Sequence, residues 1–284
     1  MPASSRPALI VTADDFGLAH EVNEAVEAAH RSGILTAASL MVGAAGAGEA
    51  VAIARRLPSL RVGLHLVLLE DRPVLAPSAV PDLVDAQGLF RRDLVRTGAG
   101  MFLRPSVRRQ LAAEIAAQFE AFRATGLPLD HVNAHKHYHL HPTVAALVLA
   151  IGPRYGMRAL RVPLEPAAVI RAIDGGGGGG TAAVMAPWSR LLGYRARRRG
   201  LIVPERVFGL AWTGAMTGER IRALVPRAGP QVTEIYTHPA TSGGFPGAAP
   251  GYRYAEELAG LTAPETRLLA AGAGLRLCGF ADLA

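Results

Sequence analysis

The chain of 284 residues contains a single cysteine, Cys278, and a single lysine, Lys136. One cysteine excludes an internal disulfide and fits a reducing compartment. No run approaches the roughly 20 apolar residues that a membrane-spanning helix needs. Residues 1–7 are short and polar, unlike a secretory signal peptide. We therefore expect a cytoplasmic protein.

Several functional motifs are also missing. The formal charge is +7, carried almost entirely by arginine, but aromatic residues make up only 6% and no nucleic-acid module accompanies the charge. We therefore expect no nucleic-acid partner. There is no Gly-x-Ser-x-Gly elbow, no phosphate-binding P-loop and no Rossmann glycine fingerprint. The six glycines of Gly175–Gly180 have the composition of a flexible linker.

Strand-like and helix-like segments alternate along most of the chain. Apolar runs that predict strands lie at residues 8–12, 37–42, 60–69, 127–135, 160–163, 231–238 and 275–280. Helical spacing of apolar residues follows at 20–31, 48–57, 106–125, 142–155, 218–224 and 256–271. This alternation, with about seven strands, is typical of a parallel sheet, either open or closed.

Two stretches interrupt the alternation. Residues 71–105 are rich in Pro, Asp and Gly, and loops of this length are usually lids or binding elements. Residues 165–212 contain the glycine tract and then Trp188–Arg199, which mixes aromatic and apolar residues with clustered arginines. That composition indicates an interfacial amphipathic helix. An ordinary surface helix with a solvated basic face is nearly as good an interpretation.

Histidines are concentrated in one stretch, His131–Pro142, which holds five of the nine histidines together with Lys136. Imidazoles at this density bind transition metals or transfer protons near neutral pH. A solvated His-rich turn is the alternative. His131 and His141 are expected to be structural or solvated.

Polar side chains also stand at the ends of separate predicted strands: Asp14 with Asp15, His65, His135 and His238. The carboxyl ends of parallel strands meet at one edge, in a barrel or in an open sheet. One Asp and two His form a common ligand set for a catalytic metal, which leaves a second carboxylate as base and another His as acid. The pattern predicts metal-assisted hydrolysis.

Each of these residues also has a structural interpretation. Asp14 could be the carboxylate that stabilises a helix N-terminus, and His65 could be a buried histidine with an ordinary hydrogen-bond partner. The pairing of Asp14 with Asp15 favours the catalytic interpretation.

Four motifs, in order along the chain, resemble the signature of the YdjC-like carbohydrate deacetylases. They are Thr12-Ala-Asp-Asp-Phe-Gly17, Gly63-Leu-His65, the cluster His131–Pro142, and Thr237-His-Pro-Ala240. The resemblance implies a single domain over residues 1–284. Its expected fold is a distorted α/β (β/α) TIM-like barrel of about seven parallel strands. Catalytic residues are expected at the C-terminal strand ends, and 71–105 and 165–212 as loop or lid insertions.

The resemblance also implies roles for individual residues. Asp15, His65 and His135 would bind one divalent metal ion, either Zn²⁺ or Mg²⁺, since such sites suit several ions. Asp14 would be the general base that activates water, and His238 the general acid for the departing amine.

Further residues are expected around this centre. Arg161 would tune Asp14, while Lys136, His137, His139 and Trp188 would contact substrate. In sugar-oligomer deacetylases of the family an Asp commonly stands two residues before the ligand histidine, whereas this chain has an Asn at position 133.

Within the family, the chain is most similar to the deacetylases associated with hopanoid biosynthesis, on Ala134-His-Lys-His137 and Val207–Trp212. This implies that the substrate is an N-acetylglucosaminyl hopanoid, a glycolipid, with Trp188–Arg199 and 71–105 as a membrane-facing lid. Peripheral contact with the inner membrane face would follow. The alternatives are a chito-oligosaccharide deacetylase, a metal-dependent phosphoesterase, and a non-enzymatic lipid or metal carrier.

Overall fold

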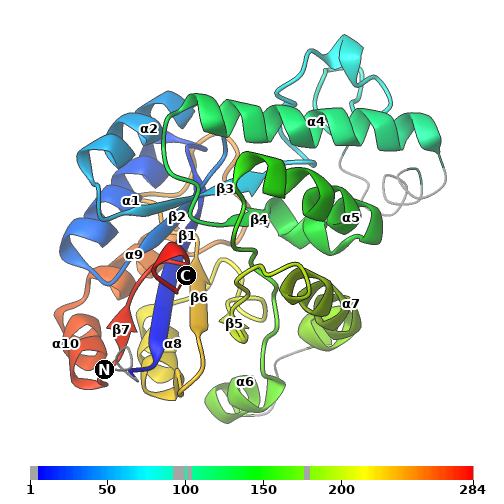
Figure 1. Ribbon diagram of the computed structural model, residues 1–284. Helices are drawn as coiled ribbons and strands as arrows, with labels where there is room; N and C mark the ends of the chain where they lie inside the picture. Colours follow the sequence, from blue (N-terminus) through cyan, green and yellow to red (C-terminus); the bar gives the residue numbers. More distant parts are fainter. Residues whose placement is uncertain (1–5, 92–99, 101–103, 176–179, 284) are drawn as a thin grey trace.

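The computed structural model describes residues 6–91, 100, 104–175 and 180–283 (Figure 1). The strands are β1 (Ala8–Phe16), β2 (Ala37–Leu40), β3 (Arg61–Leu66), β4 (Val132–Ala134), β5 (Arg206–Phe208), β6 (Thr233–Thr237) and β7 (Arg276–Leu277). The α-helices are α1 (His20–Ser32), α2 (Ala47–Arg56), α4 (Pro105–Ala124), α5 (Pro142–Ile151), α6 (Ala167–Asp174), α7 (Gly180–Arg197), α8 (Gly218–Leu224), α9 (Tyr254–Thr262) and α10 (Pro264–Gly272). The 3-10 turns are η1 (Pro77–Ala79), η2 (His135–Leu140), η3 (Gly152–Tyr155), η4 (Val225–Arg227) and η5 (Ala281–Leu283).

One parallel sheet forms the centre of the domain. Its order is β4-β3-β2-β1-β6-β5, and β7 pairs with β1 outside this path. All nine residues of β1 are buried, as expected for a central strand covered on both faces. Parallel pairing places the carboxyl ends of β1, β3, β4 and β6 at the same edge, which confirms the expected gathering of strand ends.

The sheet forms a half-barrel, so the expectation of a TIM-like barrel was wrong in respect of closure. The edge strands β4 and β5 do not pair with each other. Residues 160–163, which the sequence pattern predicts as a strand, pair only at isolated positions. Leu160 forms a bridge with Val132 and donates to the carbonyl of Ile202 at 3.0 Å, and Arg161 donates to the carbonyl of Val132 at 3.0 Å. Leu164 accepts a hydrogen bond from Val207 at 3.0 Å. Pro163 has no N–H to donate, so this segment does not continue the ladder.

Amphipathic helices cover the sheet much as their spacing predicts. Helix α1 buries Val22, Ala25, Val26 and Ala29, the four apolar positions of its sequence pattern. The helix predicted over residues 256–271 is instead two helices, α9 and α10. Pro264 starts the second of them, since proline fits the first turn of a helix but not its interior.

The two interrupting stretches differ from each other. The start of the stretch 71–105 is hydrogen-bonded to α4, because the fully buried carboxylate of Glu114 accepts the N–H groups of Val74 and Leu75. Residues 92–99 and 101–103 of this stretch lie outside the described part. The stretch 165–212 contains α6, α7 and β5. Because β5 pairs with β6, the C-terminal part of this stretch belongs to the sheet. Residues 176–179 lie outside the description. Within the described ranges no helix is long and apolar enough to cross a membrane.

Candidate metal centre

Asp14 and Asp15 stand at the carboxyl end of β1, where the strand is irregular. The register between β1 and β2 shifts between Ala13 and Phe16, and Asp15 has a φ of 61°. Asp adopts this left-handed conformation more readily than most residues. The two carboxylates consequently point to different partners. Asp14 contacts Arg161, whereas Asp15 faces two histidines.

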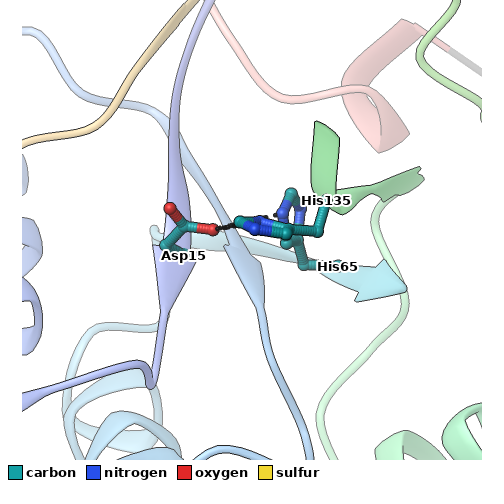
Figure 2. Close-up of side chains that lie close together, drawn as sticks. All are labelled: Asp15, His65 and His135. Atoms are coloured by element: carbon teal, nitrogen blue, oxygen red, sulfur yellow. Dashed lines mark hydrogen bonds and ion pairs between the residues drawn. The ribbon is translucent and has the colours of Figure 1, made fainter. Parts of the chain in front are cut away.

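Asp15, His65 and His135 come together from β1, β3 and the start of η2 (Figure 2). Asp15 Oδ1 lies 3.1 Å from His135 Nδ1 and 3.3 Å from His65 Nε2. One potential ligand atom from each residue falls within 4.8 Å of the others. The histidine rings are nearly perpendicular, at 78°. The three residues expected to bind a metal therefore do form a cluster.

His65 provides the test of whether a cation fits. Its Nδ1 lies 2.7 Å from Asn133 Oδ1, while its buried Nε2 has no hydrogen-bond partner. Because an amide oxygen can only accept, His65 carries a proton on Nδ1, and in the neutral ring the lone pair of Nε2 faces Asp15. An unpartnered lone pair beside a carboxylate suits a cation, and metal-bound histidines are commonly held through the other ring nitrogen in this way.

The charges at the cluster support the same conclusion. Burial lowers the pKa of His135, but Asp15 and Glu70 outweigh it and raise the pKa to about 10. Burial acts to raise the pKa of Asp15, but chiefly the charge and hydrogen bond of His135 hold it well below its usual range. The site thus attracts a positive charge, as a proton on His135 or as a divalent cation bound by these side chains.

Asp14 belongs to a buried ionic chain behind the cluster. Arg161, which is fully buried, contacts Asp14 Oδ2 at 2.5 Å and Glu234 Oε1 at 2.6 Å. Thr12 donates a hydrogen bond to the same Glu234 oxygen. Burial acts to raise the pKa of Asp14, but chiefly the charge of Arg161 holds it far below its usual range. Arg161 therefore contacts Asp14 as expected and keeps its carboxylate ionised.

His238 directly follows β6, which pairs with β1 on the side away from β2. Its backbone N–H donates to the buried carboxylate of Glu257 at 2.5 Å, and its ring lies against those of Tyr236 and Tyr252. The positive charge of a protonated His238 would also lower the pKa of Asp14. An imidazole so placed, near Asp14, can deliver a proton to a leaving group.

The expected substrate contacts occupy different surroundings. Lys136 and His137 both have positive φ, 52° and 54°, so the chain turns after His135 instead of continuing as a strand. Lys136 pairs with Glu70 at 2.5 Å, and His137 Nε2 lies 2.8 Å from the Tyr236 hydroxyl. Their contact with substrate stays a prediction.

His139 and Trp188 lie apart from the three clustered ligands. The His139 imidazole is fully buried and bonds through Nε2 to the carbonyl oxygen of Arg161 at 2.9 Å, so it supports the ionic chain and is not open to a substrate in this conformation. Trp188 stands on α7 with half of its surface exposed.

Sequence reasoning gave no role to four residues that the structure places here: Glu70, Ser39, Glu234 and Tyr236. Glu234 carried a usable signal, because a charged residue inside an otherwise apolar strand is buried only when paired. Glu70 follows β3 and also has a positive φ of 67°, which no sequence pattern indicated.

Arg161→Met should destabilise the fold by about 3–5 kcal/mol, because it leaves the carboxylates of Asp14 and Glu234 buried and unpaired. Urea denaturation measures the change. Arg123→Met on α4 is the matched control, since Arg123 pairs with Glu120 on the exposed surface and should be nearly neutral. Equal midpoints for the two variants would show that the buried pair is not required.

The fold and the cluster together define an α/β half-barrel protein with a candidate Asp-His-His metal centre at the C-terminal strand ends. The chain belongs to the family of YdjC-like proteins, whose model matches residues 8–271. This confirms the family inferred from the four motifs. The hopanoid-associated branch stays a prediction.

Known proteins support this membership over the whole chain. A carbohydrate deacetylase of Brevibacillus brevis is 33% identical over 280 residues, which cover 97% of this chain and 99% of the relative. A human carbohydrate deacetylase is 31% identical over 314 residues, covering 98% and 92%. These homologues indicate a hydrolase. A crystal structure from Enterococcus faecalis, described as a proposed cellobiose-phosphate cleavage protein, shares the fold with a TM-score of 0.76 and 24% identity, covering 98% of this chain and 99% of that one.

Proposed function

We propose that this protein is a divalent-metal-dependent carbohydrate N-deacetylase that acts on an N-acetylglucosaminyl hopanoid and releases acetate and glucosaminyl hopanoid. The observation that carries the metal-dependent chemistry is the unpartnered Nε2 of His65, which faces Asp15. The relatives named as carbohydrate deacetylases support the reaction type. The lipid part of the substrate is supported only by the two motifs similar to the hopanoid-associated deacetylases, Ala134–His137 and Val207–Trp212.

The side chains divide the reaction between them. A divalent cation held by Asp15, His65 and His135 would supply a Lewis acid that acidifies water and polarises the acetamide carbonyl. Asp14 accepts the proton of the attacking water. Because Arg161 holds the pKa of Asp14 low, Asp14 is a carboxylate at the start of the reaction and gives this proton up to solvent when acetate leaves. His238 protonates the amine as the C–N bond breaks.

One test separates the candidate substrates. Acetate release is measured with N-acetylglucosaminyl hopanoid in detergent and with soluble chito-oligosaccharides. Turnover of the hopanoid with a higher kcat/KM supports the proposal. A higher kcat/KM for the chito-oligosaccharide would support the deacetylase reaction and contradict the proposed lipid substrate. A phosphoesterase with two metals is not favoured, since one three-residue ligand cluster is found in the described ranges.

Metal removal should abolish acetate release. After dialysis against a chelator, the apoprotein should lose at least roughly a hundredfold in kcat, because no Lewis acid would remain to acidify the water. Readdition of one equivalent of Zn²⁺, Mn²⁺ or Mg²⁺ should restore turnover and identify the preferred ion. Full activity after metal analysis has verified removal would contradict metal dependence.

A further inference from the structure

Helix α7 presents an apolar face that no described part of the chain covers. Seven large hydrophobic side chains are exposed among the described residues, and four of them lie on this helix: Val184 (76%), Trp188 (50%), Leu191 (39%) and Tyr194 (59%). Their spacing of three or four residues places them along one side. A concentration of this kind on a single surface helix marks an interaction site.

The other side of α7 attaches the helix to the body of the protein. Ser189, Leu192 and Ala196 are buried there, and α7 packs against η2 and α5. The turn η2 begins with His135, a residue of the candidate metal centre. Figure 1 shows α7 on the opposite side of the sheet from α1 and α2. The apolar face therefore stands on a helix that contacts the turn leading out of the site.

Charge indicates what covers this face. Five exposed arginines lie among and after the apolar residues, at positions 190, 195, 197, 198 and 199, and the sequence has no Asp or Glu between Asp174 and Glu205. In the described part of the chain none of the five pairs with a carboxylate. Arg198 contacts the Tyr194 hydroxyl at 3.2 Å, and Arg197 and Arg199 reach only backbone carbonyls.

We propose that α7 docks the protein on an anionic lipid bilayer. Val184, Trp188 and Leu191 enter the boundary between headgroups and acyl chains, Tyr194 and Trp188 sit at headgroup level, and the arginines contact lipid phosphates. The docking itself needs only this surface. Its connection to a glycolipid substrate rests on the proposed function, because docking brings the candidate site to the surface from which such a substrate would be taken.

Vesicle binding tests the surface without any substrate. The full chain is sedimented with vesicles of phosphatidylcholine alone or mixed with phosphatidylglycerol. We expect binding to the anionic vesicles, weakened by salt as charges are screened. The fluorescence of Trp188 should shift to shorter wavelength, and Trp212, already buried at 4% exposure, should not contribute. Trp188→Phe should keep the binding and lose the shift.

Matched variants separate this face from surfaces in general. Trp188→Ser with Leu191→Ser should weaken vesicle binding at least roughly tenfold, whereas Leu268→Ser, which changes a more exposed apolar side chain on α10, should not. Arg198→Gln with Arg199→Gln should reduce binding and its salt dependence. Arg108→Gln with Arg109→Gln, on the exposed face of α4, is the corresponding control.

Three results would overturn the proposal. The first is no binding to anionic vesicles, and the second is a loss of binding in the α10 and α4 control variants equal to that in the α7 variants. The third is self-association, measured by light scattering, that the Trp188→Ser/Leu191→Ser variant abolishes, because this would assign the face to a second copy of the chain. Turnover of soluble chito-oligosaccharide should be unchanged in the Arg198→Gln/Arg199→Gln variant. Vesicle binding without deacetylation of the glycolipid would leave the docking surface intact and contradict the proposed function alone.

A second, independent observation concerns a buried hydrogen-bonded chain below the metal centre. Asp130 accepts the backbone N–H groups of Phe280 and Ala281, so the proton between Asp130 and His131 belongs to His131 Nδ1. His131 Nε2 then accepts from the hydroxyl of Ser39 at 2.9 Å. The Ser39 oxygen in turn accepts from the Asn133 amide at 2.9 Å.

This chain orients the Asn133 side chain. Its NH₂ group faces Ser39 and Asp14, the latter at 3.1 Å, and its oxygen is left to face His65 Nδ1. We infer that Asn133 is a positioning residue, held by His131 and Ser39, that makes Nε2 the ligating nitrogen of His65 and keeps a donor on Asp14. An aspartate in its place would lack both N–H donors and would set a like charge beside Asp14.

Asn133→Leu tests this role through metal affinity as well as turnover, because leucine can neither accept from His65 Nδ1 nor donate to Asp14. We expect affinity for the added metal to fall roughly 10–100-fold, and the ¹⁵N NMR shifts of His65 in the metal-free protein to lose the pattern of a proton on Nδ1. Gln118→Leu is the matched control. It changes another buried amide, bonded to Val67 and Glu114, and should leave metal affinity unchanged.

Ser39→Ala interrupts the same chain without adding charge, and it should lower metal affinity by a smaller, few-fold factor. Circular dichroism verifies that each variant is folded. Unchanged metal affinity and unchanged His65 shifts in both Asn133→Leu and Ser39→Ala would overturn the positioning role.

Discussion

Asp14→Asn should lower kcat for deacetylation by roughly 10²–10⁴-fold, the usual contribution of a general base, while bound metal stays near one equivalent. The amide has nearly the same shape as the carboxylate but cannot accept the proton of the attacking water. Asp14 is not among the three clustered ligand residues, which is why the metal should remain. Steady-state kinetics and metal analysis of the purified variant measure the two effects together.

The matched control for Asp14→Asn is Glu114→Gln. Glu114 is also a buried carboxylate, but it accepts backbone N–H groups under the loop before α4. This variant should lose stability and keep kcat in the protein that remains folded. Turnover of Asp14→Asn at the wild-type level would remove Asp14 from the reaction. If the wild-type protein also released no acetate, the non-enzymatic carrier would become the better interpretation.

The strand ends of the fold were accessible to sequence reasoning because they depend on local patterns. Each strand is a short apolar run, and a parallel sheet brings the carboxyl ends of such runs to one edge whatever lies between them. The strand ends therefore suffice to bring Asp15, His65 and His135 to one edge together with Asp14 and His238, although Asp15 and His135 are 120 positions apart. The choice of the three as ligands came from the family resemblance. Arg161 could be assigned to Asp14 only through the family resemblance.

Other features depend on contacts that leave no periodic trace. Closure of the barrel depends on how residues 160–163 pair. Leu160 and Arg161 donate to the carbonyls of Ile202 and Val132, whereas Pro163 has no N–H to donate. The histidine cluster alternates like a strand in sequence, yet positive φ at Lys136 and His137 turns it into η2. Pairing with Asn133 decides which nitrogen of His65 is free, and that contact spans 68 residues. Such contacts come from packing between separate elements, which a single sequence does not encode locally.

Asp15→Asn should remove both the metal and the activity, because it takes away the anionic member of the ligand cluster. The pKa of His135 is raised to about 10 with Asp15 as the chief favourable partner, which shows how strongly this carboxylate attracts positive charge. With a neutral amide in its place, we expect metal affinity to fall by at least roughly a hundredfold, and kcat to fall with metal content.

The comparison with Glu70→Gln makes this prediction specific. Glu70 is a second carboxylate near His135, at 3.9 Å from Nε2, and it is paired with Lys136. Glu70 lies near Nε2 of His135, whereas Asp15 faces Nδ1 of the same ring. Glu70→Gln should therefore keep the metal near one equivalent and change KM more than kcat. Isothermal titration of each apoprotein with Zn²⁺ compares the two, and equal loss of affinity would mean that the ligand set includes Glu70 as well as Asp15.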